Sequence, residues 1–316
     1  MAKKAAPKAK TSSSGTPSTK VYEAFYSSTG LLPAPFCNQV QLLEQKMGMP
    51  VVLLWHGVAD TNNMYAFLND FNYYLFARKI GQLTRGEKVA VVIFSPGGDA
   101  RAAYKLACLL RKHCGGFTAV VPQFAKSAAT LFALGADRIV MGRLAEMGPL
   151  DVQIEDAEKE QRMSALEVVQ AIERLNIEAM RAVDQQMGLW VVRSKKKVDT
   201  LLPVATNFVA EMMRPLFDKI DTVHYTGMAR ALKVAQDYAE RLLSAVGTDA
   251  TDAKTIAERL TTAYSDHGYV VDCDEMKRIG MQNVEEADSN IEGILETLAF
   301  MECNSTIIGP LKEKLI

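Results

Sequence analysis

The feature that most constrains the fold is a fourfold alternation of short apolar runs with segments of helical periodicity. Runs rich in valine, isoleucine and leucine predict buried strands at residues 50–55, 89–94, 117–121 and 138–141. Apolar residues at helical spacing predict helices over 62–82, 100–113 and 127–134. Because parallel strands need crossover connections, this order predicts an α/β fold with a parallel sheet covered by helices.

The chain changes character after residue 160. Residues 164–246 are rich in Ala, Leu, Glu, Arg and Met and show no strand pattern, which predicts helices at about 164–187, 198–219 and 226–246. These helices form either a layer on the sheet or an appended subdomain. We therefore predict four regions: a disordered basic tail (1–25), an α/β core (26–160), a helical region (161–250) and a closing segment that completes the core (251–316).

Composition narrows the class of protein. The 316 residues carry 36 basic and 37 acidic side chains, for a net charge of −1. A dedicated nucleic-acid binder has a basic excess, so nucleic acid is an unlikely partner. Every apolar run falls short of the roughly 18–20 residues that cross a bilayer, so no membrane segment is expected.

The N-terminal segment and the cysteines indicate the cellular compartment of the protein. Residues 1–20 contain five lysines and no acidic residue, which favours a solubilising leader, with contact to an anionic partner as the alternative. This segment lacks the apolar core of a secretory signal. The five cysteines form no CxxC pair, which is typical of a reducing compartment and predicts no zinc framework. We therefore expect a cytoplasmic protein.

Two consecutive strand ends carry unusual residues. The strand at 89–94 ends in Ser-Pro-Gly-Gly-Asp (95–99), where two glycines allow a tight turn whose N–H groups face a ligand. The next strand leads to Ser127, at the head of a helix whose N-terminus favours negative charge. A plain turn and a helix-capping serine are the alternative interpretations. Because neighbouring parallel strand ends converge, the two features together indicate acyl transfer by a serine nucleophile.

Four segments in order also resemble a known family. They are Ser-Pro-Gly-Gly-Asp (95–99), Ala-Lys-Ser-Ala-Ala-Thr (125–130), Leu-Gly-Ala-Asp-Arg-Ile-Val-Met-Gly (134–142) and Met-Gly-Pro-Leu-Asp-Val-Gln (147–153). They resemble the serine dehydrogenase proteinase family, within the ClpP-like and signal-peptide-peptidase-A-like serine peptidases. The resemblance implies a ClpP/crotonase-like catalytic core, with Ser127 as nucleophile and Gly97, Gly98 and Ala128 as oxyanion donors.

The sequence leaves the identity of the general base undecided. Where ClpP-like relatives carry a histidine, this chain has Asp151, and His267 lies in the segment where those relatives carry their triad acid. The unperturbed pKa of histidine suits proton transfer at neutral pH, so His267, oriented by Asp151 or Asp266, is the candidate base. Lys159 and His56 are the alternatives. Lys126 adjoins the serine, but adjacent residues do not share a helix face.

The sequence thus predicts a cytoplasmic serine hydrolase that cleaves peptide bonds in peptide or protein substrates. No metal or organic cofactor is expected. Two other classes remain open: an acyl-CoA enzyme of the crotonase type, which needs no serine nucleophile, and a catalytically silent assembly or binding subunit. A homo-oligomer is expected because closed symmetric assemblies are common. The sequence does not name the substrate, the ring size, or an unfoldase or accessory partner.

Overall fold

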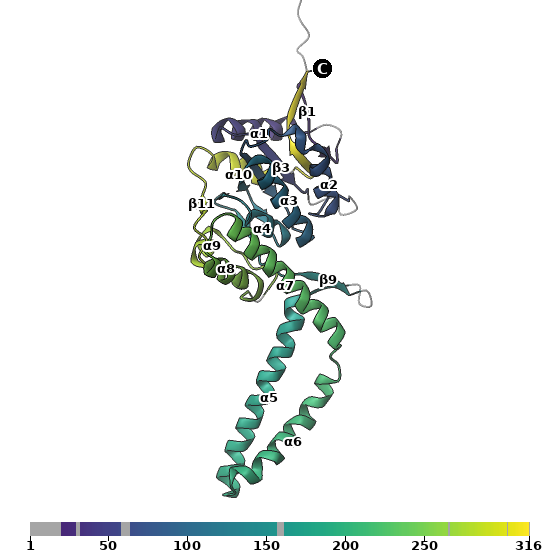
Figure 1. The fold of residues 1–316 in the computed structure, drawn as a ribbon, viewed down its shortest axis with the longest axis vertical. Helices are drawn as coiled ribbons and strands as arrows, with labels where there is room; N and C mark the ends of the chain where they lie inside the picture. The colour runs from purple at the N-terminus through teal and green to yellow at the C-terminus, as the bar shows by residue number, and fades with distance from the viewer. Residues whose placement is uncertain are drawn as a thin grey trace, which may run out of the picture.

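The computed structural model describes residues 20–29, 32–57, 64–156, 161–264, 266–301 and 303–315. They form an α/β body from which a helical hairpin extends (Figure 1). Most of the predicted tail lies outside the described residues. Its end does not: a strand begins at Lys20, inside the range 1–25 that we expected to be disordered.

A seven-stranded sheet forms the centre of the body. Its order is β11-β7-β5-β4-β3-β12-β2. The strands are β2 (Tyr26–Ser27), β3 (Val51–Trp55), β4 (Val89–Phe94), β5 (Phe117–Val121), β7 (Arg138–Met141), β11 (Val284–Glu286) and β12 (Ile307–Pro310). The neighbours from β3 to β11 are parallel, as predicted, whereas β12 pairs antiparallel with both β3 and β2. The sequence pattern had not indicated this antiparallel edge.

Helices cover both faces of the sheet, which explains why the central strands are apolar throughout. Leu53 and Trp55 pack with α1 (Ala34–Met47) and α10 (Glu292–Phe300) on one face. Val52 and Leu54 point to the other face. That face is covered by α2 (Asp70–Lys79), α3 (Ala100–Cys114), α4 (Ala128–Ala133), α8 (Ala250–Thr262) and α9 (Cys273–Arg278).

The first crossover is shorter than predicted. We expected a helix over 62–82, but α2 begins at Asp70 and is followed by a 3₁₀ turn, η1 (Ile80–Gln82). Asn69 explains the start: its side-chain oxygen accepts the N–H groups of Phe71 and Asn72, which leaves the preceding residues outside the helix. The non-helical segment around Leu68 is thereby free to pair elsewhere.

Short strand pairs extend the structure around the main sheet. β6 (Phe124–Ala125) runs parallel to β8 (Glu146–Met147) at the carboxyl ends of the central strands. Single bridges join Leu68 to Gly98 and Ser95 to Ala125 in the same area. Two further pairs lie outside it: β1 (Lys20–Glu23) with β13 (Lys312–Leu315), and β9 (Gln153–Asp156) with β10 (Gln161–Ser164).

The helical region is an extension, not a layer on the sheet. Helix α5 (Ala165–Ser194) runs away from the body, α6 (Val198–Phe217) turns back beside it, and α7 (Thr222–Ala245) returns to the body (Figure 1). Side chains of Ser164 and Asp221 cap α5 and α7. Helix α7 also packs against α3, α4 and α8, so it belongs to both parts of the molecule.

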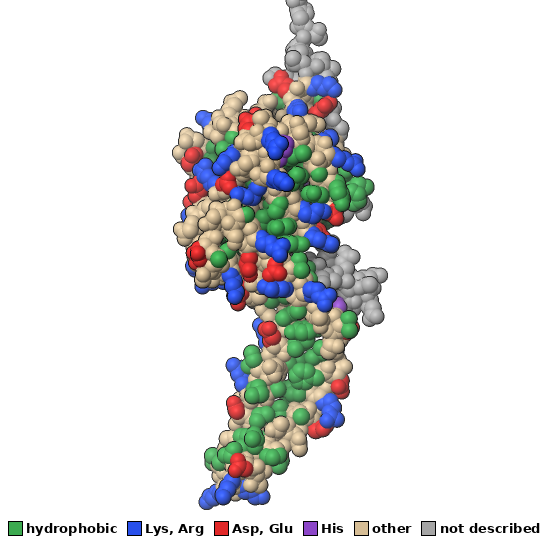
Figure 2. All heavy atoms as spheres, viewed as in Figure 1, with side chains coloured by type: hydrophobic (Ala, Val, Ile, Leu, Met, Phe, Trp, Pro, Cys, Tyr) green, Lys and Arg blue, Asp and Glu red, His purple; other side chains and the backbone are tan. Residues whose placement is uncertain are grey.

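The surfaces of the two parts differ. Apolar side chains gather along the hairpin, where the space-filling view shows an apolar strip running down the face that α5 and α6 form together (Figure 2). None of the helices in the described ranges combines the length and hydrophobicity needed to cross a membrane.

Candidate active site

Ser127 stands on a strained turn between a strand and a helix. It follows β6 and occupies the N-cap position of α4, with φ of 51° and ψ of −118°. A non-glycine residue at positive φ costs on the order of 1–3 kcal/mol, and Lys195 is the only other one in the described part of the chain. The Ser127 side chain makes no capping hydrogen bond. The alternative that Ser127 is an ordinary helix cap is therefore wrong.

The glycine turn lies directly against this serine. Gly97 and Gly98 have φ of 103° and 146°, which side-chain-bearing residues rarely adopt. A Cβ on Gly97 would lie 2.6 Å from the Lys126 carbonyl oxygen and 2.9 Å from the Ser127 Cβ. A Cβ on Gly98 would lie 2.1 Å from the carbonyl oxygen of Leu68. The two strand ends therefore meet, and only glycine fits where they do.

Two of the three expected oxyanion donors are free. Within the described residues, the N–H groups of Gly98 and Ala128 have no hydrogen-bond partner. The Gly97 N–H instead donates to the Ser95 hydroxyl oxygen at 3.1 Å. The prediction that Gly97 is itself a donor is thus corrected: its N–H is occupied, because the turn folds back on the serine that begins it.

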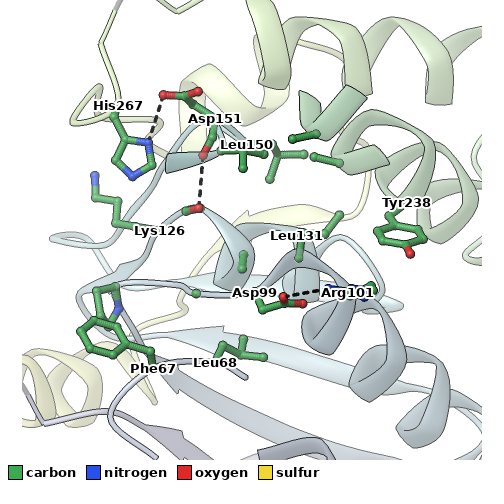
Figure 3. A pocket seen from close by; sticks show the side chains of 18 of the residues that line it. Phe67, Leu68, Asp99, Arg101, Lys126, Leu131, Leu150, Asp151, Tyr238 and His267 are labelled. Atoms are coloured by element: carbon green, nitrogen blue, oxygen red, sulfur yellow. Dashed lines mark hydrogen bonds and ion pairs between the residues drawn. The ribbon is translucent and has the colours of Figure 1, made fainter. Parts of the chain in front are cut away.

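Ser127 opens into a cleft of about 1180 Å³. Lys126 and His267 lie on one side of the cleft, and Leu131 and Tyr238 lie on the other (Figure 3). The far wall comes from α7, through Gly227, Arg230, Ala231, Val234, Ala235 and Tyr238. The cleft is therefore polar beside the serine and more apolar toward α7.

The structure brings His267 and Asp151 together. The Nδ1 atom of His267 lies 3.5 Å from Oδ2 of Asp151, whose side chain is only 2% exposed. Oδ1 of Asp151 accepts the N–H of Leu166 at 3.2 Å, which holds the carboxylate in place. Asp266, the other predicted orienting residue, instead accepts the N–H of Gly268 within its own turn.

The Ser127 hydroxyl and the His267 imidazole are not hydrogen-bonded to each other in this structure. The Ser127 hydroxyl lies 3.5 Å from the Asp151 carbonyl oxygen. No hydrogen bond joins the side chains of Ser127 and His267, both of which are described, and His267 Nδ1 is buried without a hydrogen-bond partner. Such bonds are often long before substrate binds, so the arrangement is compatible with a base that closes on the serine.

The outcome differs among the other residues considered as general base. His56 is fully buried, does not line the cleft, and has both ring nitrogens engaged, so its predicted place in the site is wrong. Lys159 lies outside the described residues. Lys126 lines the cleft although we expected it to face away, because Ser127 and Lys126 precede the helix and helical spacing does not govern them. Its Nζ pairs with Glu146 at 2.9 Å and donates to the Met147 carbonyl at 3.2 Å.

Some residues around the site had escaped the sequence analysis. Ser95 belongs to the glycine motif that we had identified, but the motif does not show that its hydroxyl is buried and bonded to the Gly97 N–H. Asn72 and the α7 side chains gave no signal, because their place depends on tertiary packing. No group of three or more His, Cys, Asp or Glu side chains within the described ranges is arranged to hold a metal ion.

Comparison with known proteins identifies the family. Residues 63–224, about half of the chain, match the ClpP-like SDH-type serine proteinases. The chain belongs to this family. The match covers the glycine turn, Ser127, Asp151 and the hairpin up to the start of α7, and with the parallel sheet it confirms the predicted fold class. His267 lies beyond the matched residues.

Individual relatives add little about activity. The chain is 26% identical to an uncharacterized protein of Methanocaldococcus jannaschii over 235 residues, which cover 74% of this chain and 65% of that protein. It is 41% identical to a second uncharacterized protein of that organism over 66 residues, covering 21% of this chain and 23% of the relative.

One solved structure is also similar. It is a membrane-bound stomatin-specific protease in complex with a substrate peptide. It is 16% identical, covers 74% of this chain and 94% of its own, and superposes with a TM-score of 0.28.

Proposed function

We propose that the protein is a serine peptidase in which Ser127 attacks the peptide carbonyl. The observation that carries the proposal is the positive-φ turn at Ser127, whose side chain makes no capping bond and lines the cleft beside two N–H groups that have no partner among the described residues. A strained strand-to-helix turn of this kind exposes a nucleophilic hydroxyl. Family membership supports the same reaction class.

The proposed steps use residues of the cleft. Ser127 Oγ bonds to the carbonyl carbon while its proton passes to Nε2 of His267, because Nδ1 faces Asp151. The carbonyl oxygen becomes an oxyanion that accepts hydrogen bonds from the N–H groups of Gly98 and Ala128. The carbon–nitrogen bond then breaks as His267 returns the proton to the leaving amine, and water hydrolyses the acyl-enzyme by the same path.

The test is covalent labelling of the full chain with a fluorophosphonate, followed by mass-spectrometric mapping. We expect one adduct, on Ser127, and no adduct in a folded Ser127→Ala variant. An adduct that persists in that variant, or a parent protein that never reacts, would falsify the proposal. The second outcome would favour the acyl-CoA enzyme or the silent subunit, and binding of coenzyme A would separate those two.

We also propose that the protein forms a homo-oligomer through the hairpin. Two helices of a hairpin bury only their facing sides, and the other sides of α5 and α6 remain apolar. The exposed side chains are Ile177, Met180, Leu189, Val192, Val198, Leu202, Val204, Phe208, Met212, Leu216 and Phe217. Exposed apolar surface of this extent is typical of interfaces. Light scattering that shows a 34.7 kDa monomer at micromolar concentration would refute this assembly.

We place the activity in the cytoplasm. Support comes from the thiols: all five cysteines are free, and Cys37, Cys114, Cys273 and Cys303 are buried. Burial raises the pKa of the Cys37 thiol to about 11, which keeps it protonated and unreactive. Fractionation of the native cells that finds the protein outside the cytoplasm would overturn this placement.

A further inference from the structure

Three fully buried polar side chains form a series of hydrogen bonds that leads to the glycine turn. His56 follows β3, Ser95 follows β4, and Asn72 lies on α2, and all three side chains are 0% exposed. The His56 Nδ1 atom is 2.7 Å from the Ser95 hydroxyl oxygen, and His56 Nε2 is 2.9 Å from Asn72 Oδ1. Buried polar groups that are fully paired define a single arrangement, because every alternative leaves one of them unsatisfied.

The partners of Asn72 determine the direction of each bond. The Asn72 amide nitrogen donates to the Phe67 carbonyl oxygen and to Asn69 Oδ1, at 3.3 and 3.2 Å. Its Oδ1 is therefore the acceptor toward His56, so His56 Nε2 carries the hydrogen. His56 Nδ1 is left as an acceptor, and the Ser95 hydroxyl donates to it. The lone pairs of Ser95 Oγ then face the Gly97 N–H, which donates at 3.1 Å.

The series of hydrogen bonds from Asn72 through His56 and Ser95 ends at the Gly97–Gly98 turn, which faces Ser127. Gly97 is held at its N–H by Ser95, and its carbonyl accepts the Leu68 N–H at 2.8 Å. The next residue, Gly98, lines the cleft, and its N–H has no hydrogen-bond partner among the described residues. Rotation of the Gly97 turn would move that N–H away from Ser127. Oxyanion donors stabilise the transition state only when they are correctly positioned. The groups that hold Gly97 in place therefore affect the rate of the chemical step.

We propose that His56 and Ser95 are positioning residues that hold the Gly97–Gly98 turn in the geometry that stabilises the oxyanion. This inference rests on the proposed function of Ser127. His56 acts as a neutral Nε2–H imidazole, and it takes no part in proton transfer. Burial lowers the pKa of His56 to about 4, which agrees with a neutral ring at physiological pH.

The kinetic test measures fluorophosphonate inactivation of the full chain, separated into the maximal rate kinact and the half-saturating concentration KI. Ser95→Ala removes the acceptor of the Gly97 N–H. We expect kinact to fall about tenfold or more with KI nearly unchanged, because the oxyanion hole acts in the transition state and not on the bound probe. Parental kinact in folded Ser95→Ala would overturn the inference, as would a rise in KI alone.

A matched control separates positioning from general loss of stability. Thr261 is also a buried hydroxyl residue, but its side chain bonds only to carbonyls of its own helix, α8. Thr261→Val removes that hydroxyl from the same body, and kinact and KI should both stay at parental values. A loss of kinact equal to that of Ser95→Ala would mean that any buried hydroxyl matters equally, and the inference would fail.

A second pair of variants tests the histidine itself. His56→Asn keeps an acceptor near the Nδ1 position for the Ser95 hydroxyl, whereas His56→Leu does not. We expect kinact to decrease in the order parent, His56→Asn, His56→Leu. Equal rates in the two folded variants would overturn the role of His56.

The final test needs neither a variant nor activity. Nitrogen-15 NMR of the parent protein should show His56 as the Nε2–H tautomer, without titration between pH 5 and 8. A ring that carries its hydrogen on Nδ1, or that titrates in this range, would overturn the inference even if Ser127 is labelled. Conversely, a parent that shows the expected tautomer but no Ser127 adduct would contradict the proposed function alone.

Discussion

The body and the hairpin of this protein are built on opposite principles. In the body, central strands such as β3, β4 and β5 are buried along their whole length, between two apolar layers. In the hairpin, α5 and α6 extend into solvent, and much of their apolar surface stays exposed (Figures 1 and 2). The body therefore stabilises itself, whereas the hairpin surface remains available to a partner.

The difference shows how the cleft divides its tasks. The body supplies the turn, the serine, the carboxylate and the imidazole, all placed by buried strands and hydrogen bonds. The hairpin contributes through α7, which begins outside the body and ends packed on α3 and α8 while lining the cleft on the way. We infer that chemistry depends on the body and access depends on the hairpin, and the following predictions test that division.

The largest effect should separate two histidines, one from each part. His267→Ala removes the proposed base, and general-base catalysis contributes about 10²–10⁴-fold, so turnover should fall by that factor. His224→Ala, at the start of α7, removes an imidazole that lies outside the cleft lining. It should leave turnover unchanged in the same peptidase assay. If His267→Ala folds normally and keeps parental turnover, the base must be sought among Lys159, Asp151 and the cleft residue Lys126.

Truncating a leucine should cost much more stability in the body than in the hairpin. Leu106 on α3 is fully buried, and truncating such a leucine to alanine costs about 2–5 kcal/mol through lost transfer energy and the cavity that remains. Leu202 on α6 is 46% exposed, so Leu202→Ala should change the unfolding free energy of the monomer by less than about 0.5 kcal/mol. Urea denaturation, at a concentration low enough to keep the protein monomeric, measures both values. Equal costs would mean that the hairpin is packed as tightly as the body.

Acid should weaken the body through His56. Its pKa is lowered from the ordinary value of 6.5 to about 4 in the folded protein. As the pH falls below 6.5, the unfolded chain therefore binds a proton at His56 that the folded protein does not bind. The unfolding free energy should therefore drop by about 3 kcal/mol between pH 7 and 4 on account of this residue. Measured against His56→Asn, the parent should lose more stability over this range. Parallel curves for the two proteins would contradict the buried neutral ring.

The sequence predicted the parts of the body whose signal is local. Apolar runs located the parallel strands, and a strand followed by glycines, then a strand followed by serine, located the cleft. Gly97 shows the limit of that approach: the motif indicated its nearness to Ser127, but only the fold shows that its N–H bonds to Ser95. His56 shows it too, since a residue after a strand end can face either the cleft or the core.

The hairpin was less predictable for a physical reason. Helical periodicity located α5, α6 and α7, but an apolar stripe does not say whether it packs on the same chain, on another copy or on the sheet. Met212 and Met213 illustrate this, because adjacent methionines of α6 are 49% and 9% exposed. The closeness of α7 to Ser127 arises from the packing of α7 on the body, which no local pattern encodes.

The smallest effect should come from filling the cleft from its hairpin side. Gly227 lines the cleft on α7, and a Cβ there would meet no atom within 4 Å, so a side chain can start at this position without a clash and, in Gly227→Leu, is expected to narrow the cleft. Gly188 is its match on α5: it is also helical, with nothing within 4 Å, and it lies outside the cleft lining. Both substitutions should stabilise their helices by about 0.5–1 kcal/mol, because glycine is a poor helix former.

Only Gly227→Leu should change catalysis. A side chain that occupies the substrate's space weakens binding in the ground state and the transition state alike, so KM should rise about tenfold with kcat nearly unchanged. The fluorophosphonate, being smaller than a peptide, should react with Ser127 at nearly its parental rate. If Gly188→Leu raises KM equally, the effect comes from hairpin stiffness. If neither variant changes KM, peptides reach Ser127 without passing α7, and the hairpin has no part in access.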